Sequence, residues 1–131
     1  MKIINKLIYL WHRQSYVKYR KKSCVKDNYI FLESQQGKNL NGNIFYIAKE
    51  LNSSLYDNYE IYLSYSKERK EDFVNLLNNY GLKKIQLVEL GSKQYYIKLS
   101  AAKYIFNDTS FLTFLFKFIY FSLYPLNLDL N

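Results

Sequence analysis

The stretch that decides the fold is a short apolar run, YIFLE at residues 29–33, followed by the polar loop SQQGKNLNGN at residues 34–43. A nearly continuous apolar run of this length is typical of a parallel strand that is covered on both faces. Three further runs, at residues 59–66, 85–90 and 103–107, are rich in Tyr, Ile, Leu and Phe. The chain therefore predicts four strands.

The segments between these strands have the apolar spacing of helices. Apolar residues recur three or four positions apart in each interval, at Ile44, Ile47, Ala48 and Leu51, at Phe73, Val74, Leu77 and Tyr80, and at Tyr95, Tyr96 and Leu99. We expect Asn43 to cap the first helix, Gly81 to close the second in the left-handed conformation, and Ser92 to cap the third.

Four strands joined by three helices predict three right-handed crossovers and hence an α/β, Rossmann-like parallel sheet. The third crossover commonly returns past the first strand, which gives the strand order 3-2-1-4. Ligands of such sheets bind where the strand order reverses, beyond the carboxyl ends of strands one and four. The loops at residues 34–43 and 107–110 leave those ends, so we place the candidate site there.

Length and composition limit the alternatives. A chain of 131 residues with 49% hydrophobic side chains is the size of one domain with one core. The chain has one cysteine, Cys24, and one histidine, His12, so neither an internal disulfide nor a soft-ligand metal site is expected. We predict no metal and no cofactor.

The charge is unevenly distributed. Of the 19 basic residues, 8 lie in residues 1–26, which contain no acidic residue, and the remaining chain is balanced. A cationic leader on a neutral body favours an anionic partner for the leader alone. The body has no basic stripe interleaved with aromatic side chains, so we do not expect nucleic-acid binding.

The leader, residues 1–27, is predicted to be a basic amphipathic helix. One interpretation is a helix lying on an anionic membrane surface, and the other is an ordinary helix docked on the core with a solvated basic side. The leader lacks the features of a secretory signal and is too short in apolar residues to span a bilayer. The candidate membrane contacts are Ile4, Leu7, Ile8, Trp11, Lys18, Arg20, Lys21 and Lys22.

The candidate site is polar but matches no phosphate-loop pattern. The glycines Gly37 and Gly42 do not form GxGxxG, and Lys38 does not follow the final glycine as in a P-loop. A glycine-and-asparagine turn before a helix is usually only a turn with a cap, and the second loop can equally be a strand end followed by a cap. No acid–base pair is evident, so no catalytic residue is assigned. The binding candidates are Ser34, Gly37, Lys38, Asn39, Asn43, Asn107, Asp108, Thr109 and Ser110.

Residues 28–111 resemble the amino-terminal region of the CDP-glycerol glycerophosphotransferases of teichoic acid and related polymer synthesis. The most specific segments are NDTSF at residues 107–111 and a loop that contains Glu33, Ser34, Gly37, Lys38, Gly42 and Asn43. This resemblance implies the amino-terminal half of a GT-B-type transferase. Such an enzyme is peripheral at the cytoplasmic face of the membrane and passes glycerol phosphate from CDP-glycerol to a lipid-linked polymer.

The chain departs from the family after the NDTSF segment. There the family carries a WHGT motif, whose histidine is the base, and then a domain that binds CDP-glycerol. Here residues 111–131 form an apolar tail, which we interpret as an out-of-frame or truncated end, or alternatively as a last element covering the edge of the sheet. We expect a catalytically inactive amino-terminal fragment. The alternative is a complete, non-catalytic binding module at the membrane surface.

Overall fold

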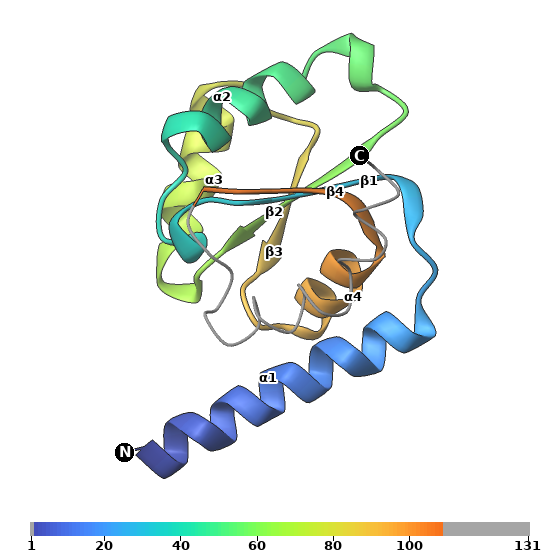
Figure 1. The fold of residues 1–131 in the computed structure, drawn as a ribbon. Coiled ribbons are helices and arrows are strands. Elements are labelled where there is room, and N and C mark those ends of the chain that lie inside the picture. The colour runs from blue at the N-terminus through green and yellow to red at the C-terminus, as the bar shows by residue number, and fades with distance from the viewer. Residues whose placement is uncertain (1, 109–131) are drawn as a thin grey trace.

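The computed structural model of the chain describes residues 2–108 (Figure 1). Its centre is a parallel sheet of the four strands β1 (Lys26–Glu33), β2 (Glu60–Tyr65), β3 (Ile85–Glu89) and β4 (Ala102–Asn107). The strand order is β3-β2-β1-β4. The predicted α/β class, parallel sheet and strand order are thus confirmed. β1 begins earlier than predicted because Lys26 already pairs with Ala102 of β4.

Helices cover both faces of the sheet (Figure 1). One face is covered by α2 (Gly42–Leu51) and α3 (Lys70–Asn79). The other is covered by α4 (Lys93–Ala101), against which α1 (Lys2–Lys22) lies. The connections also contain the short 3-10 helices η1 (Gln35–Gly37), η2 (Ser54–Tyr56) and η3 (Lys67–Arg69).

The apolar run of β1 explains why two layers of helices are required. Successive side chains of a strand point to opposite faces. Tyr29 and Phe31 therefore join the core beneath α4, while Ile30 and Leu32 join the core beneath α2 and α3. All four side chains are buried, and each such burial contributes about 2 kcal/mol.

Local capping follows the sequence in two places and departs from it in one. Gly81, at φ +64°, ends α3, and the amide of Leu82 donates to the carbonyl of Leu77. The hydroxyl of Ser92 accepts a hydrogen bond from the Tyr95 amide at 3.2 Å, as predicted. The prediction for Asn43 is wrong, because Asn41 is the N-cap and α2 begins at the left-handed Gly42, which places Asn43 in the first turn.

The leader helix is partly a core element. It ends at Lys22, before the predicted limit of residue 27, because the chain must extend to join β1. Tyr16 is fully buried between α1 and the rest of the protein, and the Trp11 ring meets the Tyr96 ring edge-on at 6.3 Å. α1 is therefore docked on α4 through its middle, at Trp11 and Tyr16.

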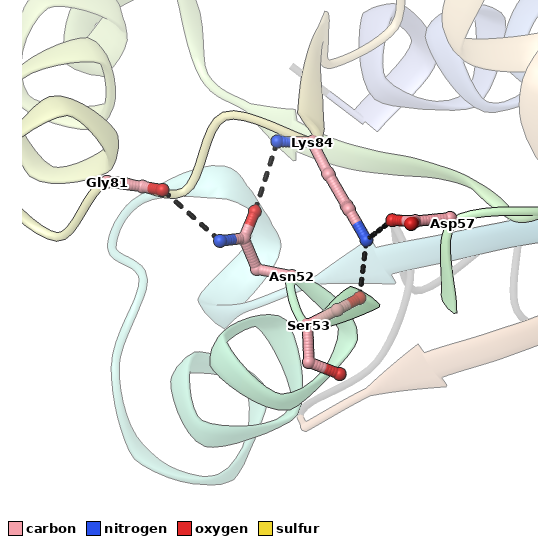
Figure 2. Close-up of polar contacts among 5 residues, drawn as sticks. All are labelled: Asn52, Ser53, Asp57, Gly81 and Lys84. Atoms are coloured by element: carbon pink, nitrogen blue, oxygen red, sulfur yellow. Dashed lines mark hydrogen bonds and ion pairs between the residues drawn. The ribbon is translucent and has the colours of Figure 1, made fainter. Parts of the chain in front are cut away.

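A polar latch joins the two loops that enter the sheet at its amino end (Figure 2). The side chain of Asn52, at the end of α2, donates to the Gly81 carbonyl at 3.2 Å and accepts from the Lys84 amide at 3.1 Å. The ammonium group of Lys84 donates to the Ser53 carbonyl and pairs with the Asp57 carboxylate. These contacts fix the α2–β2 connection against the α3–β3 connection.

Candidate functional site

The two predicted site loops meet at the carboxyl end of the sheet. Asp108 follows β4 and accepts a hydrogen bond from the Ser34 hydroxyl at 3.0 Å and one from the Gln35 amide at 2.8 Å. Ser34 follows β1 and is fully buried. Residues 74 positions apart are thereby joined in one polar cluster. Thr109 and Ser110 lie outside the described residues.

The backbone of the first loop adopts an uncommon conformation. Gln35, Gln36 and Gly37 have φ angles of +48°, +53° and +79°, all in the left-handed region that non-glycine residues rarely occupy. A Cβ atom on Gly37 would lie 2.8 Å from the backbone nitrogen of Ser66, whose amide donates to the Gly37 carbonyl at 2.7 Å. Gly37 is thus a residue of close backbone packing between the β1 loop and the end of β2.

The amide side chains of this loop bond mainly to one another. Gln35 donates to the Asn41 side chain at 2.8 Å and accepts from Asn39 at 3.2 Å. Asn43 is exposed on α2 and Asn107 is half-buried at the end of β4. Asn39 therefore helps to shape the loop, a role the sequence did not specify.

A buried carboxyl group lies beneath the cluster. Glu33, the last residue of β1, is fully buried, and its Oε1 accepts from the Ser64 hydroxyl at 2.8 Å and the Tyr95 hydroxyl at 2.9 Å. Its Oε2 is buried and has no hydrogen-bond partner within residues 2–108. Burial raises the pKa of Glu33 from 4.5 to about 7 although the two hydrogen bonds lower it, and the charge of Asp108 raises it further.

Sequence reasoning did not select Glu33 as a site residue. The available signal was a charged residue closing an otherwise apolar strand, because an acidic side chain is rarely buried without a specific purpose. Its hydroxyl partners, Ser64 of β2 and Tyr95 of α4, come from elements that periodicity alone does not bring together.

An open hollow of about 510 Å³ lies beside the cluster, over the carboxyl ends of β1, β2 and β3. Its size falls in the range of small-ligand sites. Of the predicted site residues within 2–108, Lys38 alone lines it, and the remaining lining residues belong to the loops that follow β1, β2 and β3. The lining residues are Gln36, Lys38, Ser66, Glu68, Arg69 and Leu90.

The predicted membrane contacts form an exposed face in the first half of α1. The exposed fractions are 60% for Leu7, 45% for Ile8 and 58% for Trp11, and Ile3 and Leu10 are also exposed. The side chain of Ile4 lies outside what the structure describes. In the second half, Lys18, Lys21 and Lys22 are exposed, whereas Arg20 is half-buried.

Within residues 2–108, no group of three or more His, Cys, Asp or Glu side chains is placed to hold a metal ion. Among the helices of the same part of the chain, none is both long and apolar enough to cross a membrane.

Comparison with known proteins supports the family suggested by these loops. A family model described as CDP-Glycerol:Poly(glycerophosphate) glycerophosphotransferase matches residues 14–121, which extends past both ends of the predicted region 28–111. The match includes the first part of the apolar segment 111–131. Neither the curated proteins nor the solved structures give a match. The chain belongs to the CDP-glycerol:poly(glycerophosphate) glycerophosphotransferase family and is a glycerophosphotransferase-like protein.

Proposed function

We propose that this chain forms the acceptor side of a glycerophosphotransferase and binds the polyol-phosphate polymer that receives glycerol phosphate. The polymer is a lipid-linked teichoic acid or a related cell-wall polymer. The observation that carries the proposal is the meeting of the two most specific family segments, where Asp108 bonds to Ser34 and Gln35 at the carboxyl edge of the sheet. This is the edge at which open α/β sheets bind ligands.

The chain by itself is proposed to bind and not to transfer. The family resemblance assigns the base to a WHGT motif and CDP-glycerol to a second domain, and the 131 residues contain no WHGT motif. The buried Glu33 does not substitute for the base, because a fully buried carboxyl group cannot contact an acceptor hydroxyl. We therefore expect no release of CMP from CDP-glycerol by this chain alone.

The experiment is a calorimetric titration, in which short, soluble poly(glycerol phosphate) is added to the full chain and the heat of binding is measured. We expect saturable binding that is lost in the variant Asp108→Ala, because Asp108 orders both loops. Asp57→Ala is the matched control, since Asp57 lies in the latch at the opposite end of the sheet. Binding that is absent, or equally reduced in both variants, contradicts the proposal. A parallel assay of CMP release with CDP-glycerol and the polymer must show no turnover.

We also propose that α1 keeps the protein peripheral at the cytoplasmic face of the membrane, where a lipid-linked acceptor lies. Its exposed apolar face supports insertion at the headgroup level, and its exposed lysines support attraction to anionic lipids at about 1 kcal/mol each. Deleting the leader would also remove the core residue Tyr16. Point substitutions are therefore the sharper test.

Sedimentation with vesicles measures this directly. We expect binding to vesicles that contain anionic lipid, weakening as salt rises, and a loss of binding in the variant Leu7→Gln/Ile8→Gln. Val74→Gln is the control, because Val74 is an exposed apolar residue of α3. Binding that neither the α1 substitutions nor salt reduces would overturn the membrane role of α1.

A further inference from the structure

The hollow at the carboxyl ends of β1, β2 and β3 brings two cations together from different loops. Lys38 lies in the β1–α2 loop, and Arg69 directly precedes α3. Lys38 has no ion-pair partner within residues 2–108, and its backbone amide donates to the Gln35 carbonyl at 3.1 Å. A hollow with a cation on each of two loops favours an anionic ligand.

Arg69 retains donors for such a ligand. Its Nη1 contacts the Asp72 carboxylate at 3.3 Å, and the two side chains are 52% and 68% exposed. An exposed pair of this kind contributes little to stability, and a guanidinium group has five N–H donors. Arg69 can therefore bind an anion without losing a contact on which the fold depends.

The other side chains of the hollow indicate what accompanies the anionic group. The Ser66 hydroxyl makes no capping hydrogen bond to η3, and Glu68 adds a carboxylate to the same lining. A carboxylate accepts hydrogen bonds from alcohol groups and repels a second anionic group. The combination of Lys38, Arg69 and Glu68 suits one phosphate joined to hydroxyl-bearing carbons better than a pyrophosphate.

The loops that carry these groups are held against each other. The Ser66 amide donates to the Gly37 carbonyl at 2.7 Å, and the Leu90 amide donates to the Tyr65 carbonyl at 2.8 Å. Lys38 directly follows Gly37, so its backbone is fixed relative to Ser66. Such preorganisation lowers the entropy lost on binding. Glu71 and Asp72 lie in the first turn of α3 and compensate its positive end, so the cations of the hollow are Lys38 and Arg69.

We propose that this hollow is a subsite for one polyol-phosphate unit, with the phosphate on Lys38 and Arg69 and a hydroxyl group on Glu68. The inference rests on the proposed function only in naming the unit as part of the acceptor polymer. The recognition itself, of a phosphate next to alcohol groups, follows from the lining of the hollow.

The experiment titrates the full chain with sn-glycerol 3-phosphate, inorganic phosphate and glycerol, and follows amide chemical shifts by NMR. We expect sn-glycerol 3-phosphate to bind more tightly than inorganic phosphate and glycerol not to bind. The variant Lys38→Gln/Arg69→Gln should weaken binding by about tenfold or more, the loss expected for two charge-assisted contacts. Glu68→Gln should remove the preference for sn-glycerol 3-phosphate over inorganic phosphate.

Lys83→Gln is the matched control, since Lys83 is exposed near the amino end of β3. An equal loss in this variant would show diffuse electrostatic attraction and would overturn the subsite, as would shifts confined to residues outside the hollow. Repeating the titration with poly(glycerol phosphate) separates the two proposals. If the polymer binds equally well to the parent chain and to Lys38→Gln/Arg69→Gln, the subsite is wrong and the acceptor role stands. If only sn-glycerol 3-phosphate binds, at the hollow, the acceptor role is wrong and the subsite stands.

Discussion

The two ends of the sheet carry similar polar residues, but the two ends differ in how completely these residues are hydrogen-bonded and ion-paired. At the amino end, the latch pairs both its charged groups, Lys84 and Asp57, and satisfies the Asn52 amide from two sides (Figure 2). Only the neutral hydroxyl of Ser53 is buried there without a partner in the described part of the chain. At the carboxyl end, Oε2 of the buried Glu33 carboxyl has no hydrogen-bond partner within residues 2–108, and the cost of burying a charge there raises the pKa of Glu33.

The backbone conformations at the two ends of the sheet also differ. The carboxyl-end loop places two glutamines and a glycine in consecutive left-handed conformations, whereas the latch hydrogen-bonds the ends of ordinary helices and turns. Strain and unpaired polar groups persist in a fold only when the surrounding contacts enforce them, and they concentrate at functional sites. We infer that the contacts at the amino end stabilise the fold. The strained backbone and the unpaired carboxyl oxygen at the carboxyl end lower the free energy of unfolding.

The substitution Gly37→Ala is expected to change the free energy of unfolding most. The new Cβ would meet the Ser66 nitrogen at 2.8 Å and the Tyr65 carbonyl carbon at 3.0 Å, at a φ of +79° that alanine rarely adopts. We expect the free energy of unfolding, measured in urea, to fall by about 4 kcal/mol.

Gly42→Ala is the matched control. Gly42 also has a positive φ, +59°, but a Cβ there would meet nothing within 4 Å, so only the conformational cost of about 1 kcal/mol applies. Equal losses in the two variants would show that the contact between Gly37 and the end of β2 does not hold the loop.

The second test uses pH. Because the pKa of Glu33 is raised from 4.5 to about 7, the folded state retains a proton that the unfolded state loses between these values. The contribution of Glu33 to stability is therefore complete below pH 4.5 and declines as the pH rises to 7, by up to about 3 kcal/mol. Urea unfolding of the full chain between pH 4.5 and 8 measures this decline.

The variant Glu33→Gln is neutral throughout this range and keeps the shape of the side chain. Its stability should change less with pH than that of the parent chain, so the difference between the two proteins should be largest at pH 8. Asp27→Asn is the control, because Asp27 is an exposed carboxylate that pairs with Lys103 at 3.6 Å. Identical pH dependences for the parent chain and Glu33→Gln would remove Glu33 as the source of the effect.

The sequence predicts the order of the strands and the ends of the helices better than it predicts the side-chain contacts of the candidate site. The strand order, the left-handed Gly81 and the capping Ser92 depend on periodicity or on residues a few positions apart, and all three were predicted. Asn43 failed as a cap because nothing in the local pattern distinguishes it from Asn41, and the left-handed Gly42 decides between them.

For the candidate site, the sequence predicted which two loops meet, and the structure shows that meeting. Topology alone places the carboxyl ends of β1 and β4 together, and this brings Asp108 to Ser34. The environment of Glu33 could not be read in the same way. It depends on hydroxyl groups from β2 and α4, far away along the chain, and on how completely α4 excludes water from β1.

The smallest expected change in the free energy of unfolding concerns the latch at the amino end of the sheet. Asn52→Ala removes a donor to the Gly81 carbonyl and an acceptor for the Lys84 amide, and the loss of these two hydrogen bonds should lower the free energy of unfolding by about 2 kcal/mol. Since an amide does not titrate, the loss should be the same at pH 5 and pH 8, in contrast to the effect of Glu33→Gln. Asn58→Ala is the control, because Asn58 is exposed and its side chain makes no hydrogen bond within residues 2–108. A loss for Asn52→Ala that varies with pH as the stability of the parent chain does would mean that the two ends are coupled through the sheet, and the division between a stabilising end and a functional end would then be wrong.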